Sequence, residues 1–87
     1  MLDEMIGQIV VVDLSNHFVC LGALARFDDQ FLEMHNADLH DLRDTDTSRE
    51  NYVAAARATG IKRNRRRVLL VRREVTAVSL LRDVVDD

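Results

Sequence analysis

Basic side chains supply most of the chemistry that this sequence offers, and they gather in one stretch. Eight of the twelve Lys and Arg residues are Arg57, Lys62, Arg63, Arg65, Arg66, Arg67, Arg72 and Arg73. Clustered cations of this kind bind phosphate groups. The net charge of −3, however, argues against nucleic-acid binding by the entire surface. Three interpretations of the run 62–67 stay open: a track for phosphates, a solvated loop, or a partner for the chain's own acidic segment 38–46.

The other reactive side chains do not form a catalytic or metal-binding pattern. His17, His35 and His40 lack the spacing of a helical His pair or of a Cys/His zinc site. Cys20, His17 and Asp13 contain the ingredients of a nucleophile site, but positions 17 and 20 of one strand point to opposite faces. The acidic segment lacks the Gly-containing ligand loop of a calcium site. We therefore expect no enzymatic activity, no metal and no cofactor.

Length and composition indicate one small domain, residues 1–87. A core of this size is marginal alone and gains from a partner subunit. No stretch of about 18 uncharged apolar residues is present, which predicts no membrane span. Asp3 and Glu4 argue against a secretory signal, and the single Cys20 excludes an intramolecular disulfide and is expected in the core. We expect a cytoplasmic protein.

The first half of the chain has the pattern of a three-stranded meander. We expect a short N-terminal helical turn over residues 2–7 and strands over residues 8–14, 18–27 and 31–36. Gly22 lies in the middle of the second strand, where glycine often marks a bulge or a sharp bend. A sheet that bends there can curl into a small barrel.

The second half is predicted to contain an insertion, about residues 37–66, followed by two strands. We expect an acidic loop over residues 37–46, then a helix to Ala58 with Thr47 as its N-cap and Glu50 completing a capping box, ended by Gly60. The last strands are predicted over residues 67–71 and 75–81, joined by a charged turn. The fold class is therefore mostly β, a strongly bent, five-stranded, partly open barrel.

Two segments carry a family resemblance. The stretch 22–34 (GALARFDDQFLEM) resembles the first Sm motif, which has a Gly, an apolar residue two positions later, an aromatic-Asp pair, a short loop and two pore-side residues. The stretch 71–78 (VRREVTAV) resembles the second Sm motif, whose core is an apolar residue, Arg, Gly and a small polar residue. The sequence thus resembles the Sm-like proteins, the superfamily of Sm, LSm and Hfq.

This resemblance implies a homo-oligomer and a ligand. In the family, the fourth strand of one subunit pairs with the fifth strand of the next and closes a ring of about five to seven copies. Single-stranded RNA, often rich in U, binds around the pore. The resemblance assigns base stacking to Phe31, the covering Arg to Arg72, and bracing of the loop to Asp28. From the residues alone, Phe31 has an alternative role as a core residue at the end of the barrel.

The sequence departs from the motifs at three positions. Leu32 stands where the family has the base-reading Asn, Arg73 replaces the Gly, and Glu74 replaces the small polar residue. Arg73 adds a charge for phosphates, whereas Arg72 and Arg73 have an alternative role in pairing with Glu74 between subunits. The predicted RNA-binding residues are Asp28, Phe31, Leu32, Arg72, Arg73, Lys62, Arg63, Arg65, Arg66 and Arg67. A ring that serves as a protein-interaction scaffold, without RNA recognition, is the second hypothesis.

Overall fold

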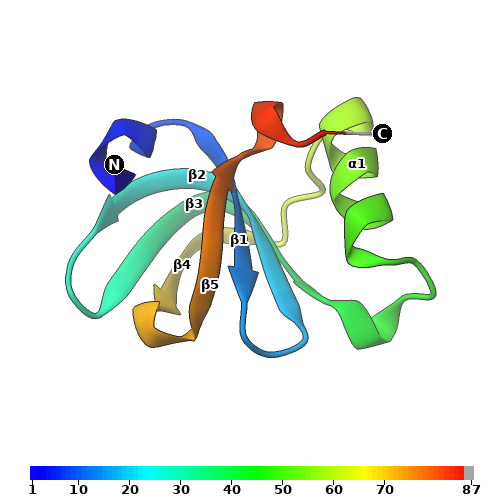
Figure 1. The fold of residues 1–87 in the computed structure, drawn as a ribbon, viewed down its shortest axis with the longest axis horizontal. Helices are drawn as coiled ribbons and strands as arrows, with labels where there is room; N and C mark the ends of the chain where they lie inside the picture. The colour runs from blue at the N-terminus through cyan, green and yellow to red at the C-terminus, as the bar shows by residue number, and fades with distance from the viewer. Residues whose placement is uncertain (86–87) are drawn as a thin grey trace.

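The chain folds into one strongly bent antiparallel sheet with a helix at one end (Figure 1). The computed structural model describes residues 1–85. Its strands follow the order β4-β3-β2-β1-β5, so β4 and β5 are the two edges. Their bounds are β1 Ile9–Leu14, β2 Phe18–Phe27, β3 Phe31–Asp41, β4 Arg65–Val71 and β5 Val75–Leu80, and the helix α1 spans Arg49–Thr59. The predicted fold class is confirmed.

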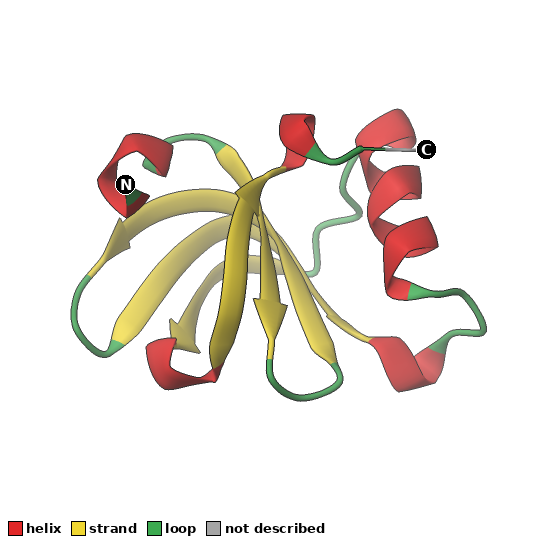
Figure 2. Ribbon diagram, viewed as in Figure 1, coloured by secondary structure: helices red, strands yellow, loops and turns green. Residues whose placement is uncertain are grey.

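Alternation along the strands divides the apolar side chains between two clusters. One cluster fills the inside of the bent sheet and includes the fully buried Val10, Leu24 and Met34. The other lies between the sheet and α1, where Val11, Val19, Leu21, Val53 and Ala56 pack together. The helix α1, labelled in Figure 1 and red in Figure 2 together with the 3-10 helices, lies at one end of the sheet. Burial on both faces stabilises a domain that has few aromatic side chains.

Gly22 allows β2 to cross β3 closely at the bend. The pairing of β2 with β3 shifts register between Leu21 and Ala23, as expected for a bulge. A Cβ atom at position 22 would lie 2.8 Å from the Cβ of Ala37 and 2.9 Å from its Cα. The backbones approach here because position 22 has no side chain, which confirms the predicted irregularity at this glycine.

The predicted acidic loop is wrong over its first half, because β3 continues to Asp41. Asn36 takes a left-handed conformation with φ +51°, which interrupts the alternation of side chains without ending the strand. After this irregularity, Ala37 and Leu39 face the inner cluster. β4 also begins at Arg65, earlier than predicted. The insertion between the paired strands is thus residues 42–64 rather than 37–66.

The N-cap of the inserted helix lies one residue later than predicted. Ser48, not Thr47, is the N-cap, and its hydroxyl accepts from the backbone amide of Asn51 at 3.1 Å. The predicted capping box through Glu50 is wrong, because it required Thr47 as the N-cap and the adjacent hydroxyl of Ser48 caps the helix instead. Gly60 ends the helix with φ +98°, as predicted.

The insertion is attached to β3 through a group of polar contacts. The amide side chain of Asn64 donates to Asp38 at 3.0 Å and accepts from the backbone amide of Leu39 at 2.9 Å. The Tyr52 hydroxyl of α1 donates to the same Asp38 carboxylate. His40 stacks on the Tyr52 ring with centroids 4.0 Å apart. Residues 42–64 are therefore held to the sheet.

The remaining differences are small. The N-terminal turn is a 3-10 helix over Leu2–Met5, the charged turn is a 3-10 helix over Arg72–Glu74, and β5 ends at Leu80.

No helix in residues 1–85 combines the length and the apolar character that crossing a bilayer requires.

Candidate nucleic-acid interface

Asp28 fixes the turn between β2 and β3. Its Oδ1 accepts from the backbone amides of Gln30 and Phe31, each at 2.8 Å, and the Asp28 amide donates to the Phe31 carbonyl at 3.0 Å. The two amide hydrogen bonds favour the charged carboxylate and lower the pKa of Asp28. The turn is therefore closed by the bracing contacts that the sequence predicted for Asp28.

The turn between β4 and β5 lies against this first turn. The backbone amide of Arg72 donates to the Gln30 carbonyl at 2.8 Å. The Arg72 guanidinium donates to the Asp28 carbonyl and lies 5.4 Å from the centre of the Phe27 ring. Arg72 thus holds the two turns together through its backbone amide and its guanidinium.

Phe31 and Arg73 are both exposed at these turns. Phe31 is 37% exposed, so its alternative role as a core residue is wrong. Arg73 is also exposed. Both line a shallow hollow together with Asp29, Gln30 and Val71. An aromatic face and a guanidinium beside one hollow are the groups that bind a nucleobase and its phosphate.

Leu32 does not belong to this surface. Its side chain is 1% exposed and lies in the inner cluster with Met34 and Leu70. Successive residues of a strand point to opposite faces, so an exposed Phe31 requires Leu32 to point inward. The prediction that Leu32 contacts RNA is therefore wrong for this structure.

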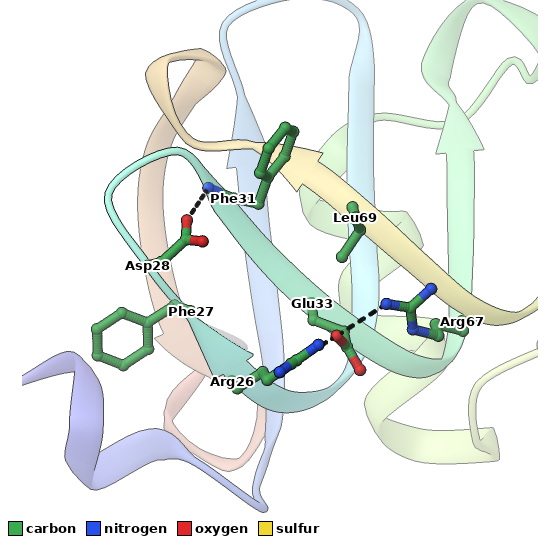
Figure 3. A pocket seen from close by; sticks show the side chains of 7 residues that line it. All are labelled: Arg26, Phe27, Asp28, Phe31, Glu33, Arg67 and Leu69. Carbon is green, nitrogen blue, oxygen red and sulfur yellow. Dashed lines mark hydrogen bonds and ion pairs between the residues drawn. The ribbon is translucent and has the colours of Figure 1, made fainter.

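A buried carboxylate lies next to the turns on the outer face of β3. Glu33 is 7% exposed, and its Oε1 accepts from Arg26 Nε at 2.8 Å and from Arg67 Nη2 at 3.1 Å (Figure 3). His35 Nε2 lies 2.6 Å from the other carboxylate oxygen. Hydrogen bonds from Arg67, then Arg26 and His35, lower the pKa of Glu33 to about 2.

Arg26 and Glu33 were missed as candidate residues. A signal was present, because opposite charges stood on the two strands beside a predicted turn, where cross-strand pairing brings them together. The observed register indeed places Arg26 opposite Glu33 and His35 opposite Arg67. The contact of Arg67 with Glu33 depends on the position of β4, which follows the whole insertion, and had no local signal.

The rest of the basic run is spread over a loop and an edge strand. Lys62 and Arg63 are exposed in the loop before β4, and Arg65 and Arg66 are exposed on the strand itself. Within residues 1–85, no ion pair joins the run 62–67 to the acidic segment 38–46. Asp38 instead contacts the neutral Asn64 side chain. The alternative of pairing between these segments is not what the structure shows.

The candidate nucleophile site is not assembled. Cys20 is fully buried, and burial raises the pKa of its thiol to about 12, whereas His17 is exposed at the turn after β1. Among residues 1–85, no three His, Cys, Asp or Glu side chains lie where they would hold a metal ion.

The fold matches a known structure, although the sequence alone does not find a relative. No family model and no curated protein matches this chain. The crystal structure of an Sm-like protein from Archaeoglobus fulgidus superposes with a TM-score of 0.62 at 18% sequence identity. The match covers 92% of this chain and 88% of that one. The chain therefore has a divergent Sm-like fold, which confirms the predicted resemblance at the level of the fold.

Proposed function

We propose that this chain assembles into a ring of about five to seven copies and binds single-stranded RNA around the central pore. The observation that carries the proposal is the exposed Phe31 beside Arg73, on two turns that Asp28 and Arg72 hold together. A rigid aromatic platform next to a cation is suited to an unpaired base and its phosphate.

Ring assembly is supported by the two edges of the sheet. β4 and β5 each have one neighbour in the chain, so each presents backbone groups that a further strand would satisfy. Pairing of β4 with the β5 of the next copy would cover both edges, and a ring satisfies every copy equally.

The bound RNA is expected to be single-stranded and weakly selected for sequence. A base stacked on Phe31 contributes about 1–3 kcal/mol whatever its identity. Leu32 is buried and apolar, so it supplies no hydrogen bond that would read a base edge. Arg73, Lys62, Arg63, Arg65 and Arg66 are exposed cations that would hold phosphates, and binding through them would be sensitive to salt.

Fluorescence anisotropy with labelled U-rich and A-rich oligonucleotides tests the RNA-binding proposal. We expect both single strands to bind at about 50 mM salt, a duplex of the same length to bind more weakly, and affinity to fall as salt rises. Absence of binding to either single strand at about 50 mM salt, where phosphate contacts are strong, would overturn it.

A protein-interaction scaffold is the second candidate function. It is favoured by the Arg72 guanidinium, which contacts the protein's own turn, and by the net charge of −3. On this account partners remain bound after nuclease treatment, and Arg72→Ala changes assembly without changing nucleic-acid affinity. RNA recovered in stoichiometric amount with the purified ring would count against it.

A further inference from the structure

We propose that Arg26 and Arg67 form a phosphate subsite, prearranged by Glu33, for the nucleotide whose base stacks on Phe31. This inference rests on the proposed function and adds to it a site on the outer face of β2, β3 and β4. Two guanidinium groups from different strands bind the same carboxylate oxygen, at 2.8 and 3.1 Å. They converge although only one of them belongs to the basic run.

Both guanidinium groups keep donors for a second ligand. Arg26 uses Nε and Arg67 uses one terminal nitrogen toward Glu33, which leaves the other nitrogens of each fork. The side chains of Arg26 and Arg67 remain 75% and 55% exposed, whereas that of Glu33 is 9% exposed. The carboxylate is thus enclosed while the cations face solvent.

The charge at this position is suited to one phosphate. The two arginines and Glu33 carry a net charge of about +1, and His35 on the second carboxylate oxygen adds a further positive charge when it is protonated. Asp28 also lines the hollow and is ionised, so the net positive charge belongs to the group of Arg26, Arg67 and Glu33 and not to the hollow as a whole; the Oδ1 of Asp28 is engaged by two backbone amides. Glu33 restricts both forks before any ligand arrives, which lowers the entropy lost on binding.

The subsite is at nucleotide distance from the stacking residue. Phe31 and Glu33 are two residues apart on the same face of β3, about 7 Å along the strand. Arg26, Phe31, Glu33, Arg67 and Leu69 line one hollow of about 200 Å³ (Figure 3). A base on Phe31 would therefore place its own or the adjoining phosphate beside the two arginines.

The test compares salt dependence in the full chain. The double variant Arg26→Gln with Arg67→Gln is measured against wild type with a labelled U-rich oligonucleotide between about 50 and 200 mM salt. Each lost phosphate contact lowers the slope of log affinity against log salt by about 0.7, so the double variant, which loses one phosphate site, should lose about 0.7 per occupied subsite. Arg57→Gln with Arg82→Gln is the matched control, because it also removes two positive charges, from a hollow beside Leu80 at the other end of β5.

A second variant pair separates geometry from folding. Arg26→Lys with Arg67→Lys keeps both charges beside Glu33 but removes the planar forks. We expect this variant to fold, to keep the salt slope and to bind at least threefold more weakly than wild type. It also serves as the test if the double Gln variant does not fold.

The outcomes distinguish failure of the subsite from failure of the proposed function. If wild type does not bind single-stranded RNA, the proposed function itself fails. If wild type binds and the folded double Gln variant keeps both its affinity and its slope, the ring binds RNA without this subsite and the inference is overturned. Equal losses in the double Gln variant and in the Arg57→Gln, Arg82→Gln control would indicate a diffuse basic surface and would also overturn it.

Discussion

The backbone amide of Arg72 donates to the carbonyl of Gln30 at 2.8 Å, and this contact joins the two turns at one end of the barrel. The residues are far apart in the sequence but lie at the ends of neighbouring strands β3 and β4. The Arg72 side chain adds contacts to the Asp28 carbonyl and the Phe27 ring. The position of Phe31 and Arg73 beside one hollow depends on this junction.

Replacement of Arg72 by Ala is expected to lower the free energy of unfolding by about 1 kcal/mol. The variant loses the hydrogen bond to Asp28 and the contact with the Phe27 ring, but keeps the backbone contact to Gln30. Urea denaturation measures the change. Arg73→Ala is the control, because it removes the same charge from the adjacent exposed residue. Equal stability of the two variants would show that Arg72 does not hold the turns together.

Replacement of Gly22 by Ala is expected to destabilise the chain by about 1–3 kcal/mol through overpacking. The added methyl group would lie 2.8 Å from the Cβ of Ala37, which is itself fully buried. Combining the variant with Ala37→Gly should cost less than the sum of the two single changes, because part of the clash is removed. Strictly additive costs in urea denaturation would mean that β2 and β3 do not approach here as described.

If Phe31 stacks on a base, its replacement should lower RNA affinity selectively. Phe31→Ala removes one stacking surface, which should weaken binding about 5- to 150-fold for each base lost. Because Phe31 is 37% exposed, the change should cost little stability. Ile9→Ala removes another exposed apolar side chain, from β1, and should leave RNA affinity unchanged. Anisotropy titrations in which both variants bind like wild type would exclude Phe31 as the stacking residue.

The ion pairs of Glu33 are expected to make part of the unfolding free energy sensitive to acid. Its pKa is lowered from 4.5 to about 2 in the folded chain, so its contribution is fully present above pH 4.5 and is lost as the pH falls toward 2. Glu33→Gln should therefore flatten the fall in unfolding free energy over this range. Asp29→Asn, which changes an exposed carboxylate that has no ion pair within residues 1–85, is the comparison. Parallel profiles for wild type and Glu33→Gln would contradict the ion-pair cluster.

The Cys20 thiol is expected to react only after the chain unfolds. It is 0% exposed, and burial raises its pKa to about 12, so almost no thiolate is present at pH 8. A thiol-specific reagent at pH 8 should react slowly with the native chain and rapidly in urea. Complete labelling of the native chain at the rate found in urea would show that β2 does not pack at the centre of the core.

The sequence predicted the fold well where signals were local. Strand β2 was predicted over its full length, Gly22 was recognised as a bend, and Gly60 was recognised as the end of the helix. β3 was predicted too short because Asn36 interrupts the alternation and acidic residues follow. Asp38 is tolerated in the strand because Tyr52 and Asn64, from the insertion, supply its hydrogen bonds. Those partners are distant in sequence, so no local pattern predicted them.

The candidate site was predicted less completely than the fold. The resemblance to the first Sm motif implied that Asp28 braces its turn, and Asp28 accepts from two backbone amides of that turn. The direction of the Arg72 side chain depends on how two turns meet, and the burial of Leu32 depends on which face Phe31 takes. The group of Arg26, Glu33 and Arg67 requires the register of three strands, which a linear pattern does not supply.

The native mass in dilute solution tests the central claim most directly. If the edges of β4 and β5 pair between copies, light scattering at near-physiological salt should give about 50–70 kDa, five to seven times the 10.0 kDa of one chain. An absorbance spectrum of the same sample would show whether RNA is carried with it. A folded species of 10.0 kDa that persists across concentrations would contradict the ring and the pore surface inferred from it.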